Sequence, residues 1–93
     1  MKAQYFVRKP IKIYKDWDSL TPFGDSNDTL VRGNKVVLLK EMKYEDFTFN
    51  SGSIGIYYGS TIARGILVQF GHFITPLRRT WVAKYKNKTK IKV

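Results

Sequence analysis

Short runs in which apolar and polar residues alternate recur along the chain. Residues 47–50 (FTFN) alternate phenylalanine with polar side chains, and residues 54–58 (IGIYY) alternate large side chains with Gly55 and Tyr57. A period of two places successive side chains on opposite faces of an extended strand. These runs therefore predict two strands about a turn at Ser51-Gly52.

Four further segments fit the same extended pattern. Residues 65–70 (GILVQF) form the most strand-like run, and residues 36–39 are apolar on both faces, which suits a strand inside a small barrel. Residues 2–8 and 11–15, separated by Lys9-Pro10, predict two strands or one broken strand. A last alternating run begins at Trp81 and, beyond Asn87, would place Lys88, Lys90 and Lys92 on one side.

The segments between these runs have different compositions. Residues 16–28 (DWDSLTPFGDSND) collect turn-forming residues and predict a loop, as do residues 71–79 (GHFITPLRR). Residues 41–47 are the only stretch that fits a helical turn. Short strands separated by glycine and asparagine turns, with no repeat or helical heptad, predict an all-β barrel or sandwich.

The order of these segments resembles a known fold. "RGNKVVLL", "SGSIGIYY", "RGILVQF" and "TWVAKY" follow one another like the strands of SH3-like small barrels, the group that includes KOW and Tudor modules. The resemblance covers roughly residues 30–86 and is carried by spacing and residue class. Many modules of this group are similar in binding RNA or ribosomal and transcription partners, which the resemblance implies as an expectation. The basic strands on both sides of this region depart from the pattern, and no Tudor-like aromatic cage is evident.

The glycine-rich stretch 51–59 (SGSIGIYYG) raises the question of a phosphate-binding loop. It lacks the G-x-x-x-x-G-K-[ST] pattern and the following helix of a P-loop. Gly52 and Gly55 fit the G-x-x-G of KH domains, but the flanks have strand character where that motif needs helices. We therefore expect these glycines to mark curvature or a place where a large side chain or another backbone segment comes close.

Length and charge narrow the range of functions. The chain has 93 residues, 17 Lys and Arg against 7 Asp and Glu, a net charge of +10 and no cysteine. Every carboxylate side chain falls between Asp16 and Asp46, so both ends of the chain are purely basic. We expect one domain (1–93) with a barrel-like core (30–86), basic flanking strands (1–15 and 80–93) and an acidic loop (16–28). No apolar run is long enough for a signal peptide or membrane span, so we expect a soluble, cytoplasmic protein.

A strongly basic surface suggests a polyanionic partner. The favoured function is non-enzymatic nucleic-acid binding of low sequence specificity, with RNA ahead of DNA because the chain offers no recognition helix. The candidate phosphate contacts are Arg78, Arg79, Lys84, Lys86, Lys88 and Lys90, extended by Lys9, Lys12 and Lys15. Tyr85 or Tyr14 would offer a stacking surface for bases, and Tyr57 and Tyr58 also suit half-exposed positions. The larger aromatic residues Trp81, Phe70, Phe6 and Phe49 are expected in the core.

Two other function classes stay open. The same charges suit a protein-interaction module that covers an acidic surface on an enzyme or polymerase, as a regulator of the kind found among bacteriophage accessory proteins would. A small ribonuclease would use His72, the only histidine, with Glu41 or Glu45 as base and Arg78 or Arg79 to stabilise the transition state. The expectation for His72 is a polar turn residue, with no catalytic, metal or cofactor site assigned. The aspartates of 16–28 lack EF-hand spacing, so we expect a polar turn there. The same loop could also fold over the basic face in the free protein and mask it. The strand at 88–93 would pair within the chain or across a homodimer.

Overall fold

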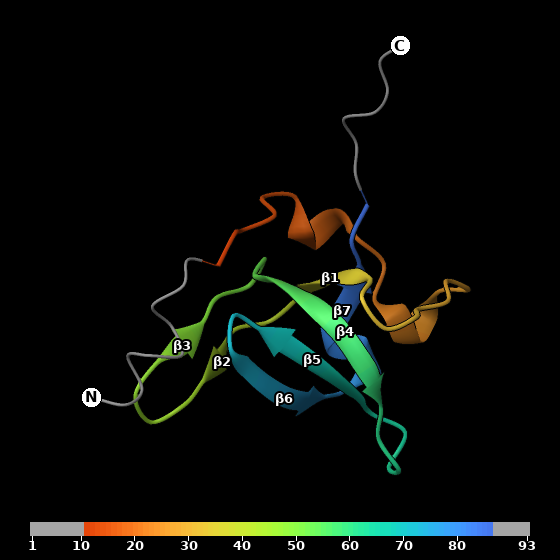
Figure 1. The fold of residues 1–93 in the computed structure, drawn as a ribbon. Coiled ribbons are helices and arrows are strands. Elements are labelled where there is room, and N and C mark those ends of the chain that lie inside the picture. The colour runs from red at the N-terminus through yellow and green to blue at the C-terminus, as the bar shows by residue number, and fades with distance from the viewer. Residues whose placement is uncertain (1–10, 87–93) are drawn as a thin grey trace.

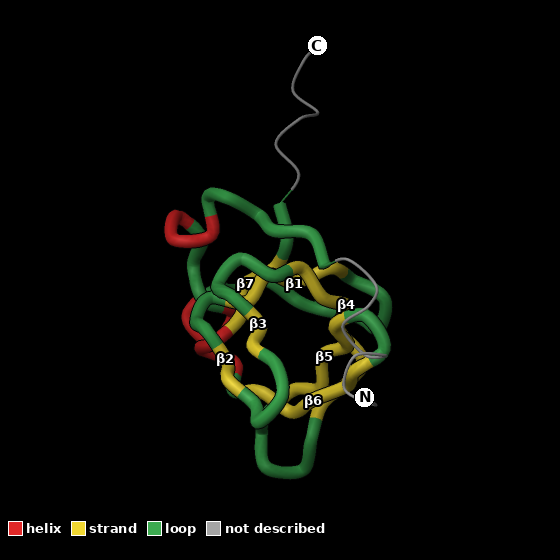
Figure 2. The backbone as a smooth tube through the Cα atoms, turned by 90° about the vertical axis from the view of Figure 1, so that its left-hand side faces the viewer, coloured by secondary structure: helices red, strands yellow, loops and turns green. Residues whose placement is uncertain are grey.

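The protein is a small all-β fold, described for residues 11–86 by a computed structural model. One antiparallel sheet has the strand order β6-β5-β4-β1-β7, and a second, two-stranded sheet pairs β2 with β3. The large sheet contains β1 (Lys35–Leu38), β4 (Ile54–Ser60), β5 (Ile66–Phe70), β6 (Phe73–Leu77) and β7 (Val82–Lys84), and the small sheet contains β2 (Met42–Lys43) and β3 (Thr48–Phe49). Viewed from the side, the strands encircle a central core (Figure 2). The predicted all-β class is confirmed.

Three short 3-10 helices connect or precede these strands. They are η1 (Trp17–Ser19) and η2 (Phe23–Asp25) in the N-terminal loop and η3 (Arg79–Trp81) directly before β7. The predicted loop at 16–28 is confirmed, since it holds only two such turns between irregular segments. In the ribbon view, this loop runs above and beside the sheet toward β7 (Figure 1).

The core lies on the inner face of the large sheet. Residues of β5 alternate between buried and half-buried, as the period of two predicts, and Ile66, Val68 and Phe70 are fully buried. Phe49 and Phe70 lie with ring centroids 5.0 Å apart at the centre. Together with Val36, Leu38 and Val82 from the neighbouring strands, these side chains form one contiguous hydrophobic cluster.

Two positions of the stretch 51–59 require glycine for specific structural reasons. A Cβ at Gly55 would lie 2.7 Å from both Phe70 Cε1 and Val68 Cγ1, so glycine here makes room for two core side chains. Gly52 has φ +93° in the turn before β4, where a Cβ would also lie 2.9 Å from the carbonyl oxygen of Tyr14. The expectation that these residues mark curvature and close approach is confirmed, and β4 begins where predicted.

Three local predictions are wrong. Residues 11–15 form no strand and make only one bridge, between Ile13 and Ser53. Residues 41–47 form no helical turn, because the backbone N–H of Tyr44 donates to the carbonyl of Phe47 (2.8 Å) and closes the β2–β3 connection. Residues 71–79 are not a loop throughout, because β6 pairs with β5 from Phe70↔Phe73 to Ile66↔Leu77.

The unpredicted strand β6 has a clear physical basis. It lies at the edge of the sheet, where a proline such as Pro76 costs no ladder hydrogen bond on its outward side. Thr75, buried on this strand, is satisfied by the hydroxyl of Tyr44 at 2.9 Å. The β2–β3 hairpin thus packs against β6 and closes the barrel on that side.

The flanking segments are described only in part. The predicted strand at 2–8 and the lysine row at 88–92 lie outside residues 11–86. Within the part that the structure describes, no helix has the length and apolar character needed to cross a membrane.

Candidate nucleic-acid interface

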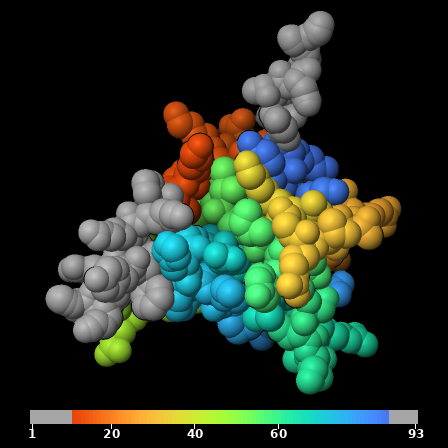
Figure 3. All heavy atoms as spheres, in the orientation of Figure 1, coloured from red at the N-terminus to blue at the C-terminus, as the bar shows by residue number. Residues whose placement is uncertain are grey.

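The two basic ends of the described chain meet at a pair of tyrosines. The backbone N–H of Tyr14 donates to the carbonyl of Gly52 (2.8 Å), which ties the N-terminal segment to the turn before β4. The Tyr14 hydroxyl donates to the carbonyl oxygen of Lys86 (3.0 Å), and the rings of Tyr14 and Tyr85 pack edge to face with centroids 5.4 Å apart. The two ends of the described chain thus come together at these residues. In the space-filling view, the orange-red N-terminal residues meet the blue C-terminal residues here (Figure 3).

Lysines surround this contact, which we call the tyrosine junction (Tyr14, Tyr85, Lys35 and Lys86). The Lys35 Nζ lies 5.4 Å from the centre of the Tyr85 ring, close enough for a cation–π interaction. The backbone N–H of Tyr85 donates to the Lys35 carbonyl (3.0 Å), which fixes the ring beside β1. Lys12 and Lys15 are exposed on the same N-terminal segment. The junction therefore combines half-buried aromatic rings with several exposed positive charges.

Two of the predicted lysines are engaged by the N-terminal loop. Lys84 donates from Nζ to the carbonyl oxygen of Thr29 (3.3 Å), and the Lys86 Nζ lies 3.6 Å from Asp28 Oδ2. That ion pair is the single one formed within residues 11–86. Because β7 is the last strand of the sheet, this loop lies along its otherwise open edge. The acidic loop thus does contact the basic segment in the free protein.

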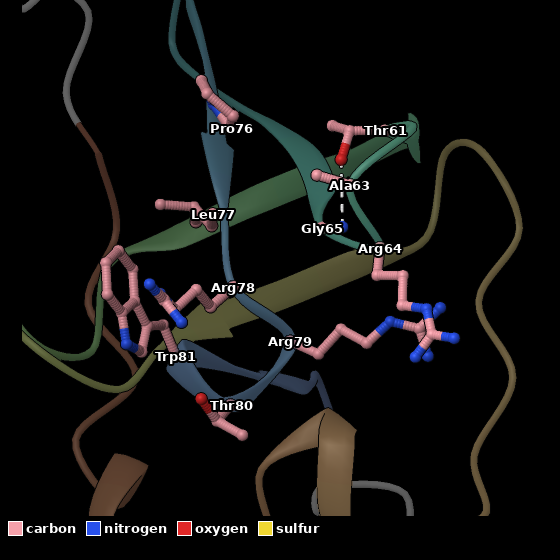
Figure 4. A pocket seen from close by; sticks show the side chains of 10 residues that line it. All are labelled: Thr61, Ala63, Arg64, Gly65, Pro76, Leu77, Arg78, Arg79, Thr80 and Trp81. Carbon is pink, nitrogen blue, oxygen red and sulfur yellow. Dashed lines mark hydrogen bonds between the residues drawn. The ribbon is translucent and has the colours of Figure 1, made fainter.

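Arg78 and Arg79 lie in a second basic feature, at the other end of β7. They line an open groove of about 580 Å³ together with Arg64 and Trp81 (Figure 4). The remaining lining residues are Thr61, Ala63, Gly65, Pro76, Leu77 and Thr80, so the wall carries no carboxylate. We call this feature the arginine groove. All three arginine side chains are exposed, as predicted for Arg78 and Arg79.

Strand register explains how these arginines come together. Ile66 on β5 pairs with Leu77 on β6, so the residues just before β5 lie next to those just after β6. Arg64 belongs to the first set and Arg78 and Arg79 to the second. Arg78 lies directly before η3, and the three residues of that helix direct Arg79 and Trp81 to either side. The groove therefore results from long-range pairing of segments that are separate in sequence.

Aromatic rings hold several of these cations in place. The guanidinium carbon of Arg78 is 5.7 Å from the ring centre of Trp81, and that of Arg79 is 5.4 Å from Phe23. Lys40 places its Nζ 4.4 Å from the Trp81 ring centre. Phe49 and Phe70 are buried as predicted, but Trp81 is only half-buried, since η3 sets it at the wall of the groove. Cation–π contacts of this kind restrict side-chain motion at modest energetic benefit, about 0.5–1 kcal/mol at exposed sites.

The other predicted tyrosines are also accessible. Tyr57 is half-buried and Tyr58 is exposed on β4. Arg32 lies over the Tyr58 ring at 4.5 Å and donates from Nε to the Tyr58 carbonyl oxygen (3.0 Å). This pair brings the cation–aromatic contacts within residues 11–86 to five. Lys35, Lys40 and Arg64 were not singled out as site residues from sequence, because only their neighbours in the folded chain indicate a role.

The grouping proposed for a ribonuclease is not assembled. His72 is exposed in the turn before β6, whereas Arg78 and Arg79 follow the opposite end of that five-residue strand. His72 and Arg78 are six residues apart along this extended segment, which at about 3.3 Å per residue separates their backbones by roughly 20 Å. Among the described residues, no three His, Asp or Glu side chains cluster closely enough to hold a metal ion.

The predicted site residues thus divide into three groups. Tyr14, Tyr85 and Lys86 meet at the tyrosine junction with Lys12 and Lys15 nearby in the chain, Arg78 and Arg79 line the arginine groove, and Lys84 on β7 lies between the two. Lys9, Lys88 and Lys90 lie outside the described residues. Comparison of the chain with known protein families, with curated proteins and with solved structures gave no significant match.

Proposed function

We propose that the protein binds single-stranded nucleic acid, RNA in preference to DNA, with low sequence specificity and without catalysing a reaction. The observation that carries the proposal is the tyrosine junction, where a hydrogen bond between Tyr14 and Lys86 joins basic segments 72 residues apart. Positive charge beside accessible aromatic rings is the combination that single strands recognise, because phosphates need cations and unpaired bases need stacking surfaces.

The candidate residues that the structure describes fall into groups with different roles in this proposal. Lys12, Lys15 and Lys35 contact phosphates, while the half-buried rings of Tyr14 and Tyr85 offer an edge and a face to bases. Arg78 and Arg79 extend the contact along β7 to its other end. The tyrosine junction and the arginine groove lie at opposite ends of β7, which rises about 3.3 Å per residue. One single-stranded nucleic acid can therefore reach both, since a small β-barrel of the OB type covers about 4–16 nucleotides.

Single strands fit better than a DNA duplex. Within residues 11–86 the helical elements are 3-10 helices of three residues, too short to fill a major groove. Contacts to phosphates and base faces do not depend on base identity, which is the reason for low specificity. We place this binding in the cytoplasm, where single-stranded RNA is accessible.

Variants of two exposed strand lysines test the proposal. Lys35 lies against Tyr85, whereas Lys43 lies on β2, in the hairpin that also carries Glu45 and Asp46. We expect Lys35→Gln to weaken binding to a single-stranded RNA about two- to fivefold by fluorescence anisotropy at moderate salt, since one phosphate contact is lost. Lys43→Gln removes the same charge elsewhere and should leave the Kd unchanged.

Material that co-purifies with the protein distinguishes a nucleic-acid ligand from an acidic protein partner. If the purified protein has a high absorbance ratio at 260 over 280 nm and ribonuclease treatment lowers this ratio, the result supports RNA binding. Equal, weak binding by the wild type and both variants, together with a stoichiometric protein band in the purified sample, would replace the proposal with the protein-interaction alternative.

A further inference from the structure

The arginine groove gathers three arginine side chains that form no ion pair with another described residue. Arg64, Arg78 and Arg79 line it, and no carboxylate lies in its wall. In Figure 4, Arg64 and Arg79 reach from opposite walls toward the same end of the groove. Like charges repel, so this arrangement is stabilised when an anion lies between the guanidinium groups.

Arg64 occupies its position at a conformational cost. It has φ +67° and is the single non-glycine residue with positive φ in the described chain. A left-handed backbone costs a non-glycine residue about 1–3 kcal/mol and is found where surrounding structure enforces it. Here the Arg64 N–H donates to the Thr61 carbonyl (3.2 Å), and Gly65 donates to the Thr61 hydroxyl (2.9 Å). The turn therefore holds an arginine where glycine or asparagine would fit with less strain.

The neighbouring wall has a different character. Arg78 and Trp81 lie close together on this wall, with the guanidinium carbon over the indole ring at 5.7 Å from its centre. Planar arginine and indole groups both stack on nucleic-acid bases. A volume of about 580 Å³ falls within the range of small-ligand sites, about 300–1,000 Å³. The groove thus offers one end to an anion and one wall to a base.

We infer that the groove binds the phosphorylated end of a nucleic-acid strand, with the terminal phosphate between Arg64 and Arg79 and the terminal base against Arg78 and Trp81. A terminal phosphomonoester carries about −1.5 to −2 charges at neutral pH, whereas an internal phosphodiester carries one. Two guanidinium groups at one end of the groove match the terminal group better, because each can form charge-assisted hydrogen bonds to it. This inference deepens the proposed function and rests on it for the identity of the ligand.

The test compares one short RNA with different ends. A single-stranded RNA of about ten nucleotides, labelled on an internal base, is prepared with hydroxyl groups at both ends, with a 5′ phosphate, or with a 3′ phosphate. We expect one phosphorylated form to bind about five- to tenfold more tightly than the hydroxyl form, which also shows the end that is recognised. Equal affinity for all three forms would overturn the inference.

Variants locate the effect in the groove. Arg64→Asn retains a residue that tolerates positive φ but removes the guanidinium. It should abolish the preference for the phosphorylated end while changing the Kd of the hydroxyl form less than about twofold. Lys43→Gln, a matched loss of charge on β2, should retain the full preference. A preference that survives in Arg64→Asn would also overturn the inference.

A second measurement separates this inference from the proposed function. Nucleoside 5′- and 3′-monophosphates are titrated into the full chain while the side-chain Nε signals of Arg64 and Arg79 are followed by NMR. Shifts with a monophosphate but not with the corresponding nucleoside support the groove even if no RNA strand binds, in which case the proposed function alone fails. No monophosphate-dependent shift would overturn the groove assignment.

Discussion

Replacing Gly55 by alanine is expected to destabilise the fold through a single added methyl group. The new Cβ would lie 2.7 Å from Phe70 Cε1, 2.7 Å from Val68 Cγ1 and 2.8 Å from Phe70 Cδ1. Both neighbours are fully buried, so neither can rotate into solvent to relieve the contact. Gly55 also pairs with Val36 across β1, which prevents the strand from moving away without breaking the ladder.

The magnitude follows from two opposing terms. Adding a methyl group to a packed core costs about 1–3 kcal/mol in displaced side chains and backbone. Alanine in place of glycine recovers about 0.5–1 kcal/mol of conformational entropy. The central values of these two terms give a net loss in the free energy of unfolding of about 1 kcal/mol, which lowers Tm by about 4–8 °C in a domain of this size.

The matched control is Gly59→Ala on the same strand. A Cβ at Gly59 meets no atom within 4 Å, so this variant gains the entropy term without the contacts. Urea unfolding followed by tryptophan fluorescence should show a lower midpoint for Gly55→Ala and an equal or higher one for Gly59→Ala. Equal midpoints for the two variants would refute the packing explanation of Gly55.

Three further predictions concern the turns and the surface. Gly52→Ala should lower the free energy of unfolding by about 1–3 kcal/mol more than Gly33→Ala, because both have positive φ but only Gly52 also faces the N-terminal segment; urea unfolding measures both, and equal losses would count against that contact. Tyr44→Phe should cost about 0.5–1.5 kcal/mol in the same assay, since its hydroxyl satisfies a buried threonine, and no loss would contradict this role. Asp28→Asn should free Lys86 and tighten RNA binding about twofold by anisotropy, and weaker binding would contradict masking by the loop.

The central strands could be predicted because their local pattern and their environment agree. β5 alternates in sequence and is alternately buried in the structure, and the apolar run of β1 lies inside the barrel. β6 was not predicted because a proline such as Pro76 usually interrupts a strand. Pro76 is tolerated here because β6 lies at the edge of the sheet. Residues 11–15 look like a strand but make one bridge, because Ile13 and Tyr14 are held by the turn at Gly52 instead of by a long ladder.

In the candidate site, too, some residues could be predicted from the local sequence and others depend on long-range strand pairing. Charge and aromatic content alone point to Arg78, Arg79, Tyr14 and Tyr85, which the structure places at accessible positions. The role of Arg64 depends on the Ile66↔Leu77 register, and no pattern within either segment specifies that pairing. Without β6 as a strand the register could not be derived, so the groove could not be predicted from sequence.

The dependence of RNA affinity on salt tests the central claim most directly. The described cations proposed to contact phosphates are Lys12, Lys15, Lys35, Arg78 and Arg79. Each contact to a single strand contributes about −0.7 to the slope of log Kobs against log salt concentration, so five contacts predict a slope of about −3.5. Lys35→Gln should reduce it to about −2.8 and Lys43→Gln should leave it unchanged. A wild-type slope shallower than about −1 would contradict binding through this basic face.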